Sequence, residues 1–196
     1  MKKIGLTGIM GAGKSSVIKI LKEASIPVLD CDQINAELLQ KGNKGYQALI
    51  KQYGQQICDE ETNIDKVKMS HMMFHHPQIK KEIEAILHPL IKQSIQNKLE
   101  TLESDIAVVE VPLLFEVHWE DAFDEIWVVS CEESLLLERL EKYRNVSKEE
   151  AKRRLAHQIP QAEKCAKADV VLMNNQDLQA LKRQVWNALG RDVDAQ

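Results

Sequence analysis

The hydrophobic positions of the chain form short continuous runs separated by longer stretches with helical spacing. Five runs of apolar, often β-branched residues have the length of strands: residues 2–7, 26–30, 106–111, 124–130 and 168–175. Such runs are typical of strands buried on both faces of a parallel sheet. Because they alternate with helical stretches, the pattern predicts an α/β fold with a mostly parallel five-stranded sheet flanked by helices.

Two long helical segments interrupt this pattern, at about residues 33–103 and 136–164. The second contains a capping box, in which Ser147 accepts from the amide of Glu150 at the start of a helix. Each segment follows a predicted strand, and ligands of open parallel sheets gather at that carboxyl edge. A last helix is expected at about 177–189. Helix breakers are expected at 41–46, 53–54, 75–77 and 88–89.

Composition narrows the possible partners. The chain has 196 residues, is 44% hydrophobic and carries a net charge of −4, whereas nucleic-acid binding needs a surplus of Lys and Arg. No apolar run approaches the roughly 20 residues that span a bilayer. The four cysteines form no CxxC pair, which is typical of reduced cytosolic thiols. The N-terminus does not resemble a signal peptide. We therefore expect a cytoplasmic protein that binds neither nucleic acid nor membrane.

The strongest chemical signal is the stretch "GLTGIMGAGKSS", residues 5–16. It lies between a predicted strand and a predicted helix, which is the context that a phosphate-binding loop requires. The glycines let successive backbone amides face phosphate oxygens, and the helix N-terminus adds partial positive charge. In such loops the lysine reaches the β- and γ-phosphates and the serine ligates Mg²⁺. The residues that match G-x-x-x-x-G-K-[ST] are Gly8, Gly13, Lys14 and Ser15.

The class of nucleotide enzyme follows from what surrounds this loop. GTPases read guanine through N/T-K-x-D, and neither "NKGY" nor "NKLE" contains the aspartate. ATPase motors are longer and carry paired acidic residues after a strand. A small chain with helical insertions at the sheet edge favours a P-loop small-molecule kinase, in which a lid keeps water from the γ-phosphate.

Candidate acceptor-side residues lie where two strands end. Asp30 and Asp32 follow the second strand, where one of them can act as general base and either can cap the next helix. His88 precedes Pro89, and a lone histidine beside a helix breaker is more often structural. The apolar loop 112–116 can line an acceptor pocket or belong to the core.

These segments together resemble one family. "IGLTGIMGAGKS", "VLDCDQI", "IEAILHPLI", "VPLLFE", "AKRRLAHQ" and "KADVVLMNN" are similar to dephospho-CoA kinases over nearly the whole chain. The resemblance implies ATP-dependent phosphorylation of the ribose 3′-hydroxyl of dephospho-CoA, with Mg²⁺, to give CoA and ADP. It also implies one kinase domain, which we expect to be monomeric. Its parts are a core (1–32, 104–135 and 165–196), a helical acceptor-binding region (33–103) and a lid (136–164).

The resemblance also assigns residues to roles. It implies that Asp32 is the base, that Lys14 acts on the phosphates, and that Arg139 on the lid neutralises charge on the transferring phosphoryl group. Asn174 is placed near the ATP base. The implied ATP-binding residues are Gly8, Gly11, Ala12, Gly13, Lys14, Ser15, Ser16 and Asn174, with Ser15 on Mg²⁺. The implied substrate-binding residues are Asp32, His88, Pro112, Leu113, Leu114, Phe115 and Glu116.

Some positions depart from the family's usual pattern. Ile9 follows the first loop glycine where the family has a second glycine, and Leu136, Tyr143 and Lys66 replace Gln, Arg and Arg. Two other functions remain open from the residues alone. One is a nucleoside or nucleoside-monophosphate kinase, and the other is a nucleotide-binding module with little chemistry.

Overall fold

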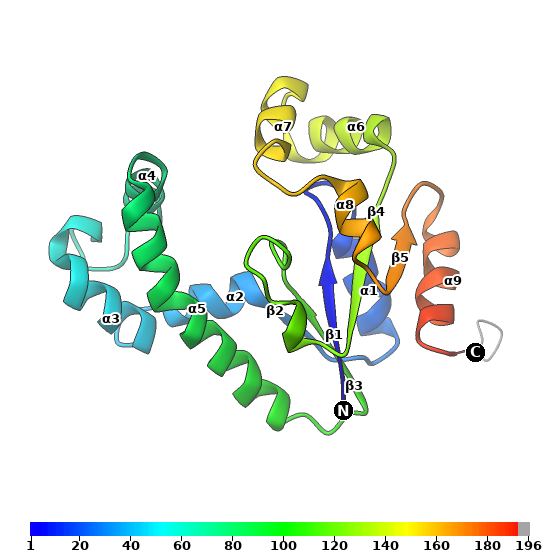
Figure 1. Ribbon diagram of the computed structural model, residues 1–196, viewed down its shortest axis with the longest axis horizontal. Helices are drawn as coiled ribbons and strands as arrows, with labels where there is room; N and C mark the ends of the chain where they lie inside the picture. Colours follow the sequence, from blue (N-terminus) through cyan, green and yellow to red (C-terminus); the bar gives the residue numbers. More distant parts are fainter. Residues whose placement is uncertain (192–196) are drawn as a thin grey trace. The chain divides into compact units, whose positions relative to one another are not determined.

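The computed structural model describes residues 1–191 and divides the chain into two compact units. The first unit comprises Met1–Leu29 and the chain from Glu103 onward, and the second comprises Asp30–Leu102. A five-stranded sheet with the order β2-β3-β1-β4-β5 confirms the predicted α/β fold (Figure 1). The strands are β1 (Lys2–Thr7), β2 (Val28–Asp30), β3 (Ile106–Glu110), β4 (Glu125–Ser130) and β5 (Val170–Met173).

The central strand β1 explains why the apolar runs are continuous. It pairs in parallel with β3 on one side, where Ile4 is opposite Val108, and with β4 on the other, where Leu6 is opposite Trp127. All four of these side chains are buried. A strand with neighbours on both sides and helices over its faces has no solvent face, so period-two alternation is absent.

Helices of the first unit pack around this sheet. They are α1 (Lys14–Glu23), α6 (Glu133–Arg144), α7 (Lys148–Leu155), α8 (Gln161–Ala166) and α9 (Leu178–Ala188), with a short 3₁₀ turn η2 (Glu120–Ala122). Helix α1 packs against α9, and α8 packs against β4. In Figure 1, α6 and α7 lie beyond the carboxyl ends of β1 and β4. Within α6, Leu136 and Leu140 are buried in the same core cluster as Trp127.

The predicted capping box begins α7. Ser147 Oγ accepts a hydrogen bond from the Glu150 amide at 3.2 Å, which confirms the N-cap. The Glu150 carboxylate pairs with Arg154 at 2.7 Å and with Arg153. Glutamate therefore stabilises this helix through i,i+3 and i,i+4 ion pairs on an exposed face.

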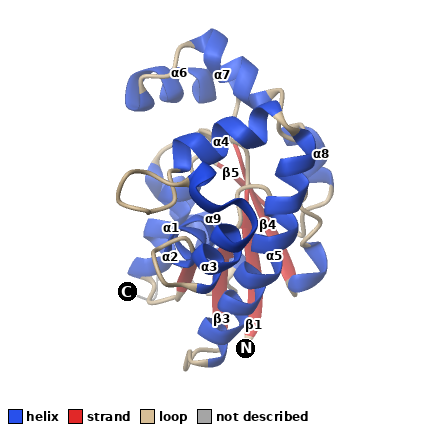
Figure 2. Cartoon of the chain, turned by 90° about the vertical axis from the view of Figure 1, so that its left-hand side faces the viewer, coloured by secondary structure: helices blue, strands red, loops and turns tan. Residues whose placement is uncertain are grey.

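The second unit is built on helices (Figure 2). They are α2 (Cys31–Leu38), α3 (Lys44–Tyr53), the 3₁₀ turn η1 (Gly54–Ile57), α4 (Lys66–His75) and α5 (Pro77–Glu100). Helices α2, α3 and α4 all pack against α5. The buried stripe of α5 recurs every fourth residue and consists of Ile83, Leu87, Ile91, Ile95 and Leu99. Lys98 on α5 also pairs with Glu37 on α2 at 3.0 Å.

One predicted helix breaker is wrong. Pro89 lies inside α5, which continues from Pro77 to Glu100. Proline lacks the N–H that would bond one turn back, which costs roughly 3 kcal/mol in an isolated helix. The apolar stripe on both sides of Pro89 is long enough that burial against three other helices outweighs this loss. Tertiary packing therefore overrides the local signal.

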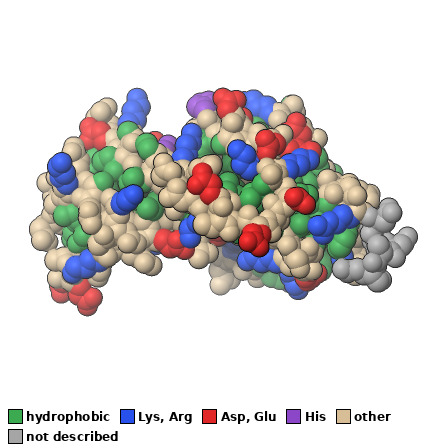
Figure 3. Space-filling model, turned by 90° about the horizontal axis from the view of Figure 1, so that it is seen from below, with side chains coloured by type: hydrophobic (Ala, Val, Ile, Leu, Met, Phe, Trp, Pro, Cys, Tyr) green, Lys and Arg blue, Asp and Glu red, His purple; other side chains and the backbone are tan. Residues whose placement is uncertain are grey.

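The surface carries both charges. Figure 3 shows one face of the molecule, on which Lys and Arg side chains are interspersed with Asp and Glu. Among residues 1–191, no helix is both long and apolar enough to cross a bilayer. The predicted absence of partners such as nucleic acid or membrane remains a prediction.

Candidate functional site

The phosphate loop connects the end of β1 to the start of α1. Gly8, Gly11 and Gly13 have φ values of +148°, +87° and +101°, a region that favours glycine. Gly13 is the N-cap of α1 in a left-handed conformation, and no side chain caps this helix. Helix α1 thus begins directly after the loop without a side-chain cap, as helices at anion sites do.

Two of these glycines also have no room for a side chain. A Cβ on Gly8 would lie 2.4 Å from the Val129 carbonyl oxygen of β4. A Cβ on Gly13 would lie 2.0 Å from Nδ2 of Asn174. Both the backbone conformation and the close approach of neighbouring strands therefore require glycine at these positions.

Two polar residues, Lys14 and Ser15, come directly after the last glycine of the loop. Lys14 Nζ donates to the carbonyl oxygens of Gly8, at 2.8 Å, and Ile9, at 3.5 Å. It therefore lies over the loop rather than pointing into solvent. Ser15 is exposed in the first turn of α1. The predicted lysine and serine thus both lie in the first turn of α1, directly after the loop.

Asn174 supports the loop from β5. Its Nδ2 donates to the Ala12 carbonyl at 2.9 Å, and its own amide donates to the Ser130 carbonyl at 2.7 Å. The residue is buried. Its side chain therefore holds the peptide that precedes Gly13, and contact with the ATP base stays a prediction.

The two aspartates after β2 have different local roles. Asp30 is the N-cap of α2, because its Oδ1 accepts from the amides of Asp32, at 2.8 Å, and Gln33, at 3.0 Å. The sequence left open which of the two aspartates caps this helix, and the structure shows that it is Asp30. Asp32 lies in the first turn of α2 and is exposed. A general base needs an accessible carboxylate, and Asp32 meets that condition.

His88 lies in the middle of α5 rather than beside a break. Burial lowers the pKa of its imidazole, an effect that nearby Glu84 opposes and Lys92 reinforces. A lowered pKa keeps the ring neutral at neutral pH, when one nitrogen can donate and the other can accept. Its part in acceptor binding remains a prediction.

The loop 112–116 after β3 divides into core and surface. Leu114 and Phe115 are fully buried, and Leu114 lies against Gly5 of β1. Leu113 is 43% exposed. The Pro112 carbonyl accepts from the buried Thr7 hydroxyl at 3.2 Å. Burial therefore favours the core interpretation for Leu114 and Phe115, and leaves Leu113 as the accessible apolar side chain.

Glu116 ends this loop in an ion pair. Lys164 on α8 is completely buried, and its Nζ lies 2.8 Å from Oε1 and 3.0 Å from Oε2 of Glu116. Oε1 also accepts from the Ile159 amide at 2.9 Å. Burial alone would raise the pKa of the Glu116 carboxyl, but the hydrogen bonds from Lys164 and Ile159 hold that pKa below its usual range. The carboxylate is therefore ionised and already bonded within the protein.

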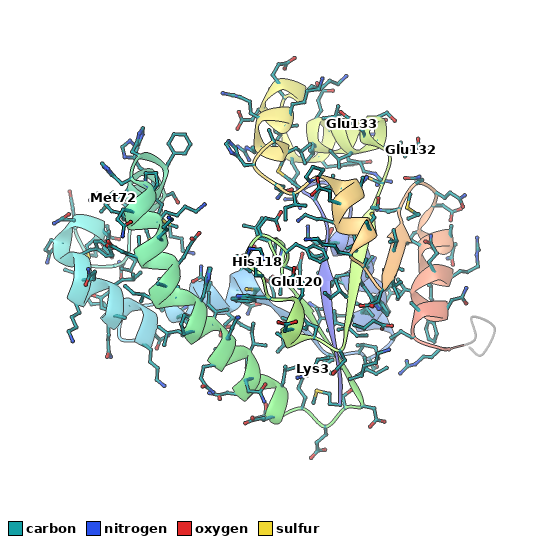
Figure 4. The ribbon with its side chains drawn as sticks, in the orientation of Figure 1. Lys3, Met72, His118, Glu120, Glu132 and Glu133 are labelled. Carbon is teal, nitrogen blue, oxygen red and sulfur yellow. The ribbon has the colours of Figure 1, made fainter. Side chains whose placement is uncertain are left out.

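Amide side chains join the ends of the predicted lid to the sheet. Glu132 and Glu133, labelled in Figure 4, mark where the chain leaves β4 for α6. Asn175 Oδ1 accepts from the Glu132 amide at 2.8 Å. Gln161 exchanges two hydrogen bonds with the backbone of Cys131, at 3.2 and 2.8 Å. Both ends of the helical insertion are therefore anchored next to each other.

Arg139 on α6 keeps an unused donor. Its Nη1 is buried and has no hydrogen-bond partner among the described residues. The guanidinium also lies beside the Cys131 thiol, whose pKa burial raises and Arg139 partly lowers. A buried donor without a partner is costly, and a phosphate oxygen is the kind of acceptor that guanidinium groups bind.

Among the departures from the family pattern, the structure explains Leu136. Leu136 is buried, and with Leu140 it packs against Gly11 of the phosphate loop. An apolar residue therefore suits this place. Tyr143 is 72% exposed and Lys66 is also exposed. The structure does not explain the substitutions at those two surface positions.

Sequence reasoning missed three residues that connect these parts. Lys164 gave no signal, because an isolated lysine on a charged stretch predicts a solvated side chain. Gln158 and Gln161 stand in or beside the quoted "AKRRLAHQ" without an assigned role. Within the described residues no group of three His, Cys, Asp or Glu side chains can hold a metal.

The chain is similar to known proteins over nearly its whole length. The sequence model of a family described as dephospho-CoA kinase matches residues 2–180. A dephospho-CoA kinase of Streptococcus agalactiae is 39% identical over 192 residues, which is 97% of this chain and 98% of that protein.

Solved structures are similar over the same length. A crystal structure from Thermus thermophilus has a TM-score of 0.86 at 28% identity and covers 96% of both chains. Dephospho-CoA kinase from Campylobacter jejuni has a TM-score of 0.71 at 25% identity, over 97% of this chain and 96% of that one. This chain belongs to the dephospho-CoA kinase family.

Proposed function

We propose that this protein transfers the γ-phosphoryl group of ATP to the ribose 3′-hydroxyl of dephospho-CoA, giving CoA and ADP in the last step of CoA biosynthesis. One observation carries the proposal. The match to dephospho-CoA kinases covers 97% of the chain, so it includes the helical second unit as well as the widespread phosphate loop. A loop shared by many nucleotide enzymes would match only the first unit.

The loop residues 8–16 bind the phosphates in this proposal. Backbone amides between Gly11 and Ser16 donate to phosphate oxygens, and the N-terminus of α1 contributes its partial positive charge. Lys14 moves from the Gly8 carbonyl to the β- and γ-phosphates. Binding is strong because the glycines hold these donors in place before the ligand arrives.

The site also fits Mg²⁺. Mg²⁺ prefers oxygen ligands and usually keeps several waters, with only one or two protein ligands beside the substrate phosphates. The exposed hydroxyl of Ser15 is such a ligand. When bound, the ion would neutralise charge on the β- and γ-phosphates.

Three side chains then act on the transfer itself. The Asp32 carboxylate accepts the 3′-hydroxyl proton as the hydroxyl oxygen bonds to the γ-phosphorus and the bond to the ADP oxygen breaks. Lys14 stabilises the charge on the phosphates. Arg139 offers its unpaired Nη1 to the transferring group. His88 and the accessible Leu113 of loop 112–116 bind the acceptor, while Leu114 and Phe115 support that loop from the core.

A coupled assay for ADP tests this function directly. ATP and Mg²⁺ are supplied with dephospho-CoA, AMP, CMP, adenosine or no acceptor, and the product is identified by mass. We expect turnover only with dephospho-CoA, with CoA as product. Turnover on AMP or CMP would instead support a nucleoside-monophosphate kinase, and equal slow turnover in every tube would support a nucleotide-binding module.

The same proposal also predicts the partners, the location and the oligomeric state of the protein. A small-molecule kinase needs no macromolecular partner, and on the face shown in Figure 3 Lys and Arg are interspersed with Asp and Glu, whereas nucleic acid requires a surplus of positive charge. We propose a cytoplasmic monomer. Light scattering after gel filtration would give a mass near 22.4 kDa, and a mass of twice that value would contradict the monomer.

A further inference from the structure

The segment in which the predicted lid returns to the sheet, residues 158–164, contacts several functional parts at once. We call it the return segment. Gln158 Oε1 accepts from the Met10 amide of the phosphate loop at 3.1 Å. The next residue, Ile159, donates its amide to Glu116 at 2.9 Å. Gln158 and Ile159 thus join the phosphate loop to the end of loop 112–116.

The other end of the return segment fixes Glu116 more firmly. Lys164 binds both oxygens of the Glu116 carboxylate and lies 3.5 Å from the Pro112 carbonyl oxygen. It therefore contacts the first and the last residue of loop 112–116. Because Lys164 is fully buried, removal of either charge would leave the other unpaired, which is strongly destabilising in buried pairs.

Core packing alone does not require the ion pair between Lys164 and Glu116. Apolar side chains of similar volume often replace a buried ion pair without loss of stability. A charged pair instead fixes direction and distance, because its hydrogen bonds tolerate little displacement. Here the same carboxylate also accepts from Ile159, so a shift of loop 112–116 pulls directly on the residue next to Gln158.

We infer that the return segment is a positioning device that couples loop 112–116 to the phosphate loop, with Lys164 and Gln158 as its positioning residues. Lys164 acts through Glu116 on the loop, and Gln158 acts on the Met10 amide. The inference rests on the proposed function, since that loop is the proposed acceptor side. Binding of dephospho-CoA should therefore tighten binding of ATP, and by linkage the reverse.

The experiment measures this coupling by calorimetry. A non-hydrolysable ATP analogue with Mg²⁺ is titrated into the protein with and without dephospho-CoA, and the ratio of the two dissociation constants is the coupling factor. We expect a factor of about 5 or more for the unaltered protein, which is the range of typical coupling between sites. Gln158→Leu should bring the factor close to 1, since leucine cannot accept from Met10.

The matched control is a glutamine that makes the same kind of hydrogen bond outside the return segment. Gln184 on α9 also accepts a backbone N–H, that of Met173, at 2.8 Å. Gln184→Leu should keep the coupling factor of the unaltered protein. Both glutamines are only partly buried, so both variants should fold. A factor near 1 in the unaltered protein, or the same factor in Gln158→Leu, would overturn the inference.

A second variant tests the ion pair without leaving a buried charge. Glu116→Leu combined with Lys164→Met keeps an apolar core but removes the hydrogen bonds to Ile159 and Pro112. We expect near-normal thermal stability, a higher KM for dephospho-CoA and a coupling factor close to 1. An unchanged factor in this folded variant would also overturn the inference.

Turnover of the unaltered protein distinguishes a failure of the inference from a failure of the proposed function. If it phosphorylates dephospho-CoA but Gln158→Leu stays coupled, only the inference fails. If it does not turn over dephospho-CoA at all, the proposed function and the inference fail together.

Discussion

The two units place chemistry in different ways. In the first unit the phosphate loop presents backbone amides, and its shape depends on glycines pressed against β4 and Asn174. In the second unit the proposed chemistry belongs to side chains on helices, namely Asp32 in the first turn of α2 and His88 within α5. A backbone site can be recognised from a short motif, whereas a side-chain site depends on how its helices pack.

The largest effect is expected in the second unit. Asp32→Asn removes the proposed base while keeping size and hydrogen bonding, so kcat should fall by about 10²–10⁴-fold. Affinity for ATP should remain close to normal. Steady-state kinetics and calorimetry with an ATP analogue measure the two quantities.

Asp30→Asn is the matched control for this change. Asparagine is as good an N-cap as aspartate, so the bonds to the amides of Asp32 and Gln33 are kept. Its kcat should stay near that of the unaltered protein. Equal losses in both variants would mean that the carboxylates act through α2 rather than as a base.

The corresponding test of the first unit is Lys14→Ala. The lysine contacts charge on the phosphates, so both ATP affinity and kcat should fall, with kcat/KM lower by about 10²–10³-fold. Lys19→Ala, an exposed lysine on the same helix, should change kcat/KM by about twofold or less. Unchanged ATP affinity in Lys14→Ala would refute the phosphate-loop assignment.

A smaller effect should reveal how packing dominates the second unit. Pro89→Ala restores a hydrogen bond inside α5, so the free energy of unfolding should rise by about 1–3 kcal/mol in urea titration. Pro77→Ala at the first turn of the same helix is the control, because proline is favoured there and nothing is gained. If both variants have the same stability, Pro89 carries no strain in this helix.

The smallest effect concerns pH and the first unit. The folded pKa of Glu116 lies below its ordinary value of 4.5, so the carboxylate contributes stability above that value. This contribution is lost as the pH falls from about 5 through the lowered pKa. Glu116→Gln leaves the buried Lys164 without its charged partner, so it should be less stable at neutral pH. Over this acidic range it should lose less additional stability than the unaltered protein.

Chemical denaturation at several pH values measures that difference. Glu163→Gln, an exposed position on α8, should retain the pH dependence of the unaltered protein. If Glu116→Gln also retains it, the ion pair with Lys164 does not contribute to acid stability.

The strands were predictable because each is a short continuous apolar run, and the central strands β1, β3 and β4 are largely buried on both faces. Helix ends were predictable where a polar side chain caps them, as Ser147 does. The predicted end of the helix at Pro89 was wrong, because the packing of α5 against three other helices outweighs the tendency of proline to break a helix. The acceptor loop was ambiguous for a similar reason, since the apolar letters of Leu113, Leu114 and Phe115 do not say which side chain is exposed.

By itself the sequence determined the α/β class and the phosphate loop, because amide cradles and buried strands depend on residues adjacent in the chain. Only the tertiary structure decided which polar side chains hold the phosphate loop and loop 112–116 in place. Asn174 bonds a residue 162 positions away, Gln158 one 148 positions away, and Lys164 one 48 positions away. Such pairs leave no periodic trace, since a hydrogen bond depends on distance and direction in space rather than on separation along the chain.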